Sequence, residues 1–289
     1  MQAKLTIALQ KSGRLADGCM RLFQNSGINI TTAKNKLLIQ DKDFGVDFIF
    51  ARDDDIPGLV ANGVCDLGIV GANLLQEYNL STVSVIKKLG FAKCRLSIAK
   101  PTTIKNMSLS DLNDKVIATS YPNILTKFLN ENDIKANIVT MHGSVELAPK
   151  IGMADYIFDL VSSGATLKEN GLSEFMVVAQ SEAVLIGSNK KLSQSKQVLL
   201  DRLLLRIDGV MLASKRRYIM MHLDRDKVSC LSKIIPGCEA PTILQLQDIP
   251  QKVAVHLVSI EELFWDTIEK LKEIGATSIL VLPIEKMID

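Results

Sequence analysis

The sequence predicts an α/β protein with two lobes, each built on its own sheet, followed by a smaller module of the order β-α-β-β-α-β. Two patterns predict this fold. From residue 5 to about residue 180, short apolar runs typical of strands alternate with amphipathic runs typical of helices. After Arg217 the spacing changes, and four strand-like runs enclose two helical ones in the order of a ferredoxin-like fold.

The first lobe is expected to begin with three strand–helix units. Apolar runs predict strands at 5–9, 47–51 and 66–70, with helices near 15–25, from Asp55 and from Ala72. Asp55 can cap the second helix, and Pro57 fits its first turn, where a missing N–H group is tolerated. The strand-like run 96–100 and the polar stretch 102–114 then indicate a crossing into the second lobe.

The second lobe is expected to hold strands at 116–119, 137–141 and 156–161, with helices starting at Tyr121-Pro122 and at Ser144. Strand-like runs at 175–179 and 183–186 and an amphipathic helix at 197–211 then return the chain to the first lobe. We therefore expect the first lobe at 1–100 and 180–214, and the second at 101–179. Two such lobes place their strand ends across a cleft, where helix N-termini converge on a ligand.

The C-terminal module is expected to cover residues 215–289. Its strands are predicted at 218–223, 242–246, 253–258 and 278–282, and its helices at 226–235, closed by Pro236-Gly237, and at 261–274. Modules of this kind often bind small effectors between subunits, although a fold alone does not establish a function.

Composition excludes several classes of function. The 289 residues carry a formal charge of only +2, and the one tight basic run, Lys215-Arg216-Arg217, is better interpreted as a solvated linker than as a nucleic-acid site. Five widely spaced cysteines contain no Cys-x-x-Cys pair, and the three histidines share no ligand spacing, so we expect neither disulfides nor a metal site made by protein residues. No signal region and no membrane-spanning apolar stretch is visible, which predicts a cytoplasmic protein.

A phosphate-binding loop is predicted between the strand 156–161 and the helix that follows it. The small residues of the turn, Ser162, Ser163, Gly164, Ala165 and Thr166, let the backbone close around an anion, and the N–H groups at a helix start favour negative charge. Asp159 lies just upstream, and a carboxylate beside a phosphate site must bind sugar hydroxyls or a Mg²⁺ carried in with a polyphosphate. The predicted ligand is therefore a phosphorylated sugar, although corners rich in Ser and Gly are common in α/β proteins.

Further candidates for binding and catalysis follow other strand ends. The sequence Lys11-Ser12-Gly13-Arg14 joins a backbone anion site to two cations, which suits a triphosphate but also fits a charged surface loop. Arg95 either reaches a phosphate or forms an ion pair between the lobes, and Glu146 either faces a ribose or belongs to a helix cap. The remaining candidates follow or frame strands and are Arg52, Asp66, Gly68 and Gly71.

Long motifs, in order along nearly the whole chain, resemble the ATP phosphoribosyltransferase family. They are Asp159-Leu-Val-Ser-Ser-Gly-Ala-Thr166, Ile7-Ala-Leu-Gln-Lys-Ser-Gly-Arg14, Arg52-Asp-Asp-Asp-Ile-Pro57, Gly63-Val-Cys-Asp-Leu-Gly-Ile-Val-Gly71, Ile117-Ala-Thr-Ser-Tyr-Pro-Asn123, Gly143-Ser-Val-Glu-Leu-Ala-Pro149 and Ile279-Leu-Val-Leu-Pro-Ile-Glu-Lys-Met287. The chain departs from the family pattern at Ser163, where Thr is usual, and at Ala92-Lys93, which follow Phe91 where Gly is usual. The last motif resembles the long form of the enzyme, which carries its own regulatory domain.

The resemblance implies a type II periplasmic-binding-protein-like fold and a reaction. A 5-phosphoribosyl group would pass from its diphosphate to N1 of ATP and release pyrophosphate, with Mg²⁺ as cofactor. Asp159, Glu146 and Arg52 would serve catalysis, residues 162–166 the donor, and the other candidates the nucleotide: Lys11, Ser12, Gly13, Arg14, Asp66, Gly68, Gly71 and Arg95. Histidine would inhibit from the C-terminal module around Thr242, Ala276 and Ser278, and dimers would assemble into a hexamer.

Two alternatives remain on the sequence alone. A two-lobed protein that binds a solute or senses an effector without catalysis would need an export signal or a DNA-binding domain, and neither is visible. An amino-acid-binding regulatory protein would rest on the C-terminal module, but the hydroxyl-rich loop with Asp159 argues against it.

Overall fold

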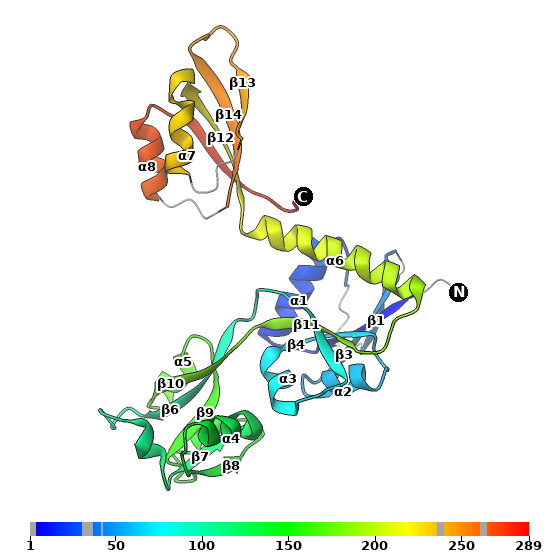
Figure 1. Ribbon diagram of the computed structural model, residues 1–289, viewed down its shortest axis with the longest axis vertical. Coiled ribbons are helices and arrows are strands. Elements are labelled where there is room, and N and C mark those ends of the chain that lie inside the picture. Colours follow the sequence, from blue (N-terminus) through cyan, green and yellow to red (C-terminus); the bar gives the residue numbers. More distant parts are fainter. Residues whose placement is uncertain (1–3, 31–36, 42, 236–239, 261–264, 289) are drawn as a thin grey trace. The chain divides into compact units, whose positions relative to one another are not determined.

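The computed structural model describes residues 4–30, 37–41, 43–235, 240–260 and 265–288, and the chain divides into two compact units. The first unit comprises residues 1–21 and 30–197, and the second comprises residues 22–29 and 198–289. The first unit contains a six-stranded and a five-stranded sheet, and the second contains a four-stranded sheet (Figure 1).

The six-stranded sheet is the core of the first lobe. Its order is β2 (Leu38–Gln40), β3 (Val46–Ala51), β1 (Leu5–Gln10), β4 (Leu67–Gly71), β11 (Ala183–Ser188) and β5 (Val83–Lys88). Strands β3, β1 and β4 are parallel, so their carboxyl ends share one edge. The helices of this lobe are α1 (Arg14–Asn25), α2 (Asp55–Ala61) and α3 (Ala72–Tyr78). Ile56 and Val60 of α2 are fully buried in a cluster with Ala8 of β1, which holds this helix on the sheet.

The five-stranded sheet is the core of the second lobe. Its order is β10 (Leu172–Ser181), β6 (Cys94–Pro101), β9 (Tyr156–Val161), β7 (Val116–Thr119) and β8 (Asn137–Thr140). Helix α4 (Pro122–Glu131) covers one face through Ile124 and Leu125, and α5 (Ala165–Glu169) packs Leu167 on the other. Short 3₁₀ helices at Leu109–Leu112 and Val145–Leu147 complete the lobe.

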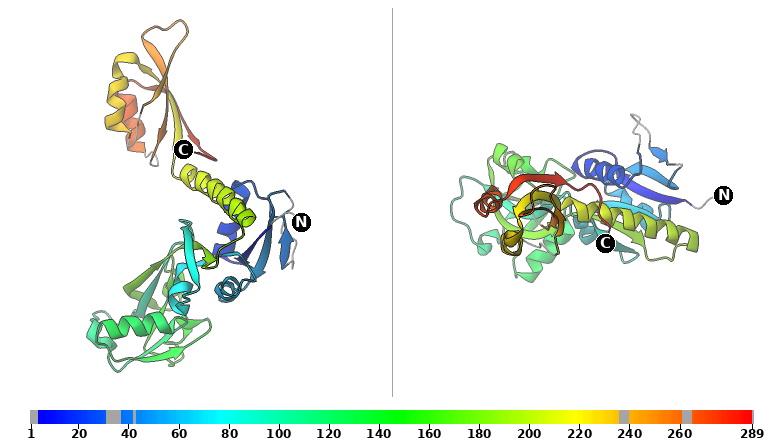
Figure 2. Two further views of the ribbon diagram at one scale, coloured as in Figure 1. Left: turned by 45° about the vertical axis from the view of Figure 1, so that its right-hand side comes forward. Right: turned by 90° about the horizontal axis from the view of Figure 1, so that it is seen from above.

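Strands β6 and β10 carry the chain from one lobe to the other. They pair with each other antiparallel along most of their length, from Leu172 opposite Pro101 to Ser181 opposite Cys94. The two crossings therefore lie side by side within the sheet of the second lobe, as Figure 2 also shows. The boundaries expected for the lobes from the sequence stay predictions.

The second unit contains the C-terminal module and most of the long helix α6 (Gln194–Ser214). The module runs β12 (Arg217–Asp224), a 3₁₀ helix at Arg225–Cys230, α7 (Leu231–Ile234), β13 (Thr242–Gln245), β14 (Lys252–Ser259), α8 (Trp265–Glu273) and β15 (Thr277–Pro283). The strand order is β13-β14-β12-β15, entirely antiparallel, with α7 and α8 on one face (Figures 1 and 2). Alternate residues of β12, such as Ile219 and Met221, are buried under these helices. The expected two-lobed α/β fold with a ferredoxin-like module is confirmed.

Several local expectations were wrong or incomplete. Asp55 does not cap α2, because the helix already begins at Asp55 and the preceding Asp54 makes no side-chain cap. The helix expected from Ser144 is only a 3₁₀ helix, and the first half of the helix expected at 226–235 is also 3₁₀. Strands β2 and β5, which are edge strands with mostly exposed residues, were not predicted from the sequence. Pro236-Gly237 and residues 261–264 lie outside the described residues.

Candidate active site

Strand ends from both lobes surround a cavity of about 250 Å³ in the first unit. Gln10 ends β1, Arg14 begins α1, Gly71 ends β4, Cys94 begins β6, and Ser162 follows β9. Parallel strands place their carboxyl ends at one edge of a sheet, which is where α/β proteins bind ligands. Three of the sequence-predicted site residues, Arg14 and Gly71 of the first lobe and Ser162 of the second, therefore line one cavity.

The predicted phosphate loop forms a tight turn between β9 and α5. Gly164 adopts a left-handed conformation, with φ of +80°, and its carbonyl oxygen accepts the first hydrogen bond of α5 from the Lys168 N–H group, at 3.1 Å. Within the described part of the chain, the backbone N–H groups of Ser163 and Thr166 donate to no protein atom, and that of Ala165 makes only a 3.4 Å contact with Ser163 Oγ. Because α5 has only five residues, an anion at this turn would depend on these free N–H groups more than on a helix dipole.

Asp159 lies within β9, three residues before Ser162, and is half-buried on the same face of the strand as Ile157 and Val161, which cluster with Leu167 of α5. One carboxylate oxygen accepts a hydrogen bond from the Leu160 N–H group at 2.7 Å. The pKa of the Asp159 carboxyl is raised to about 6, chiefly by burial and to a smaller extent by the negative charge of Glu146, against the lowering effect of the hydrogen bond from the Leu160 N–H group. The two carboxylates are therefore near enough to interact, and Asp159 changes its charge close to neutral pH.

Arg95 is committed to protein groups. Its guanidinium forms an ion pair with Glu174 of β10, with Nη2 at 2.6 Å from Oε2 and Nε at 2.8 and 2.9 Å from the two carboxylate oxygens. Nη1 donates to the backbone carbonyl of Ser162 at 2.9 Å. Of the two alternatives that the sequence left open, the structure realises an ion pair, but one inside the second lobe.

Three exposed cations follow the strands of the first lobe. Lys11 and Arg14 flank the turn after β1, in which Gly13 has a φ of +96°, and Arg52 follows β3. The Lys11 N–H group donates to the Ala51 carbonyl at 3.1 Å, which ties the two loops together. Among the described residues, no carboxylate pairs with any of these three side chains. Free cations beside a cavity are suited to polyphosphate.

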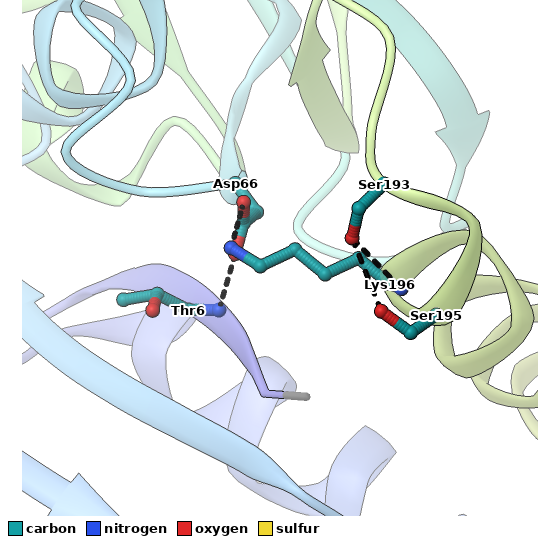
Figure 3. A network of polar contacts seen from close by, with 5 residues as sticks. All are labelled: Thr6, Asp66, Ser193, Ser195 and Lys196. Atoms are coloured by element: carbon teal, nitrogen blue, oxygen red, sulfur yellow. Dashed lines mark hydrogen bonds and ion pairs between the residues drawn. The ribbon is translucent and has the colours of Figure 1, made fainter. Parts of the chain in front are cut away.

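Asp66 lies away from these cations. It precedes β4, at the opposite end of the strand from Gly71, and its carboxylate contacts Lys196 Nζ at 2.7 and 2.8 Å and the Thr6 N–H group at 2.9 Å (Figure 3). Ser193 accepts from the Lys196 N–H group at 3.4 Å and so helps to start α6. A role of Asp66 in nucleotide binding stays a prediction, and the contacts indicate that it joins β1, β4 and α6.

The two candidate glycines of β4 differ in their surroundings. A Cβ atom on Gly68 would lie 2.6 Å from a methyl carbon of Ile56, so this glycine lets α2 pack closely. Gly71 lines the cavity, and a Cβ atom there would lie 2.2 Å from Oδ1 of Asn73, at the start of α3. Only Gly71 lies where a ligand can reach.

Sequence reasoning missed several residues of the cavity. Asp53 lines it, and burial followed by the adjacent Asp54 raises the pKa of its carboxyl. Ala92 and Lys93 also line it, and Ala92 has a left-handed backbone with φ of +49°. The signal for Asp53 was its place directly after β3. The departure from the family pattern at Ala92-Lys93 is visible in the sequence, but its nearness to the cavity depends on long-range packing.

The candidate effector residues do not meet within one chain. Thr242 lies on the edge strand β13 and lines a cavity of about 760 Å³ with Tyr218 and His256, whose side chains are hydrogen-bonded to each other. Ala276 and Ser278 lie at the start of β15, the opposite edge strand. Three strand spacings separate the edges, roughly 14 Å, which is more than one amino acid can span.

The described residues contain no group of three or more His, Cys, Asp or Glu side chains that could hold a metal ion. No helix in the described part of the chain is long and apolar enough to cross a membrane.

The fold and the cavity define a two-lobed α/β protein with a tight Ser- and Gly-rich turn in one lobe and exposed cations in the other. The family model described as ATP phosphoribosyltransferase matches residues 52–209, and that of its C-terminal domain matches residues 213–286. An ATP phosphoribosyltransferase of Bacteroides fragilis (strain ATCC 25285) is 50% identical over 285 residues, covering 98% of this chain and 99% of the relative. The solved ATP phosphoribosyl transferase complex of Thermotoga maritima has a chain that is 26% identical, with a TM-score of 0.59, covering 71% of this chain and 98% of that one.

The chain therefore belongs to the ATP phosphoribosyltransferase family, in the long form with a C-terminal domain. It is an enzyme of the first step of histidine biosynthesis, with ATP and phosphoribosyl diphosphate as substrates.

Proposed function

We propose that the transfer takes place in the 250 Å³ cavity, with the donor on the second lobe and ATP on the first. Residues 162–166 bind the 5-phosphate of the donor through their free N–H groups and hydroxyls. Asp159 binds the ribose hydroxyls, with Glu146 beside it. Lys11, Arg14 and Arg52 bind the polyphosphates. The single observation that carries this proposal is that Arg14, an exposed cation of the first lobe, and Ser162, the first residue of the loop of the second lobe, line the same cavity.

The chemistry needs alignment more than a reactive side chain. A ring nitrogen of adenine is already a nucleophile, so no covalent enzyme intermediate is required. The task of the protein is to hold N1 in line with C1 of the sugar and to stabilise a cationic sugar and an anionic leaving group as they separate. A carboxylate at Asp159 lies on the sugar side, and the cations of the first lobe lie on the polyphosphate side.

Mg²⁺ fits this site as a companion of the substrate. The carboxylates of Asp159 and Glu146 interact near the loop, and two carboxylates suit a metal whose other ligands are phosphate oxygens and water. When bound, Mg²⁺ would neutralise the pyrophosphate. Asp159 would then hold the metal-bound donor as well as the ribose.

The C-terminal module is proposed to bind histidine and to inhibit the enzyme from a distance. Since Thr242 and Ser278 lie on opposite edge strands, one histidine touches both only if two subunits meet around it, which fits a dimer that assembles into a hexamer. A Thr242→Leu variant should keep catalysis and lose both the heat of histidine binding and the inhibition. If histidine still inhibits the Thr242→Leu variant, the effector site lies elsewhere. We further propose that this enzyme of histidine biosynthesis is located in the cytoplasm.

The donor site is tested with Thr166→Val, which keeps the shape of the side chain and removes its hydroxyl. Pyrophosphate release with ATP saturating should show a KM for the donor that is raised about tenfold or more, because a hydrogen bond to a charged group contributes about 1.5–3 kcal/mol. The KM for ATP should stay as it is. Unchanged donor kinetics in a folded variant would refute the assignment of the loop.

A further inference from the structure

The Arg95–Glu174 pair lies directly behind the proposed donor loop. Arg95 extends from β6, where its backbone pairs with Val161 at the end of β9, and Glu174 extends from β10 on the other side of β6. The guanidinium thereby touches the strand on each side: Glu174 through Nε and Nη2, and the Ser162 carbonyl through Nη1. Both side chains are mostly buried, with exposed fractions of 32% for Arg95 and 25% for Glu174.

The Ser162 carbonyl is joined rigidly to a donor of the loop. A peptide unit is planar and trans, so the C=O group of one residue and the N–H group of the next point in opposite directions. A hydrogen bond from Arg95 to the Ser162 carbonyl therefore sets the direction of the Ser163 N–H group, which faces away from the guanidinium. Within the described residues that N–H group has no protein acceptor, and Ser162 itself lines the cavity.

We propose that Arg95, held by Glu174, is a positioning residue that fixes the Ser162–Ser163 peptide and so aims the Ser163 N–H group at the phosphate of the donor. The inference rests on the proposed function of the loop. Glu174 holds the guanidinium with two oxygens, so that it cannot swing away from the loop. Without this bond, the Ser162–Ser163 peptide can rotate, and the loop loses one aligned donor before the substrate arrives.

Two variants separate this role from a general effect on stability. Arg95→Lys keeps the positive charge beside Glu174. The lysine ammonium lacks the several N–H groups with which the guanidinium binds Glu174 and the Ser162 carbonyl at the same time. The exchange of the two residues, Arg95→Glu with Glu174→Arg, restores an ion pair but leaves a carboxylate beside the carbonyl. The control is Lys115→Met, which removes the 3.7 Å ion pair with Asp155 at the other end of β9.

The measurements are calorimetric binding of phosphoribosyl diphosphate, KM values for both substrates, and thermal unfolding. Arg95→Lys and the exchange should each weaken donor binding about tenfold while the KM for ATP stays within twofold, and the exchange should recover most of the thermal stability. Lys115→Met should leave donor binding unchanged. If Arg95→Lys does not fold, Glu174→Gln replaces it in the comparison. Donor binding should then weaken by about threefold.

Donor binding that is normal in Arg95→Lys, or restored by the exchange, would overturn the inference, because the pair would then serve only stability. A different result would contradict the proposed function of the loop. If Thr166→Val also binds the donor normally, the loop is not the donor site. If Thr166→Val loses donor binding and Arg95→Lys keeps it, the loop stands and the positioning role is wrong.

Discussion

The Glu77 carboxylate at the end of α3 accepts a hydrogen bond from the backbone N–H group of Ile124 at the start of α4, at 3.0 Å. It also accepts from the Asn123 N–H group at 2.9 Å. The two helices belong to different lobes, and Pro122 at the first position of α4 has no N–H group to offer. Glu77 is therefore the N-terminal cap of α4, supplied by the other lobe.

Replacing Glu77 with Ala should destabilise the first unit. Glu77 is only 5% exposed, so its loss leaves two N–H groups without an acceptor, at a cost of about 1–3 kcal/mol. Thermal unfolding measures the loss, and Glu131→Ala is the control because that glutamate is exposed on the same helix α4. Equal midpoints for both variants would mean that the cap does not hold the lobes together.

Asp159 should make stability depend on pH. Its folded pKa of about 6 lies above the value of 3.8 for a free carboxyl, so below about pH 3 the group is protonated in both states and contributes nothing. Between about pH 3 and 6 the unfolded chain releases the proton first, and above pH 6 the folded state bears the full penalty. Asp159→Asn should therefore be more stable than the unmodified protein at pH 8, by up to about 3 kcal/mol, and about equally stable at pH 3. Denaturant unfolding at the two pH values tests this, and a lower stability at pH 8 would contradict it.

Gly164→Ala should impair the donor loop. A left-handed backbone disfavours alanine by about 1–2 kcal/mol, so the turn either strains or changes shape. Gly63→Ala is a matched control, because Gly63 has a φ of +76° with open space around it. Both variants should lose similar stability, but only Gly164→Ala should raise the KM for the donor. A raised donor KM in both would point to a general effect of strain.

Asp66→Asn should weaken the fold and leave nucleotide use intact. The carboxylate is 14% exposed and is held by Lys196 and the Thr6 N–H group, so its loss should cost about 1–3 kcal/mol (Figure 3). Lys196→Met should give a similar loss because it breaks the same contact. A raised KM for ATP at unchanged stability would instead place Asp66 among the nucleotide-binding residues.

Much of this fold could be predicted because its strands are buried. The run at 156–161 coincides with β9, and 116–119 with β7, because most residues of both strands are apolar and buried. The loop after β9 was predictable because Gly164 supplies the left-handed turn at a strand end. The partners of Arg95 and Asp66 were not predictable, because they depend on Glu174 and Lys196, which lie 79 and 130 residues away. Neither the Glu77 cap nor Ala92 left a local pattern, as both depend on how the lobes pack.

Pyrophosphate release on mixing ATP with phosphoribosyl diphosphate, compared between the unmodified protein and Asp159→Asn, tests the central claim most directly. With both substrates saturating, the unmodified protein should release pyrophosphate only when both are present. Its kcat/KM for the donor should rise as pH passes about 6, because Asp159 then becomes a carboxylate. Asp159→Asn should lose most of the turnover and the inflection near pH 6 while unfolding at no lower temperature. Normal turnover in a folded Asp159→Asn variant, with the same pH profile, would contradict the account.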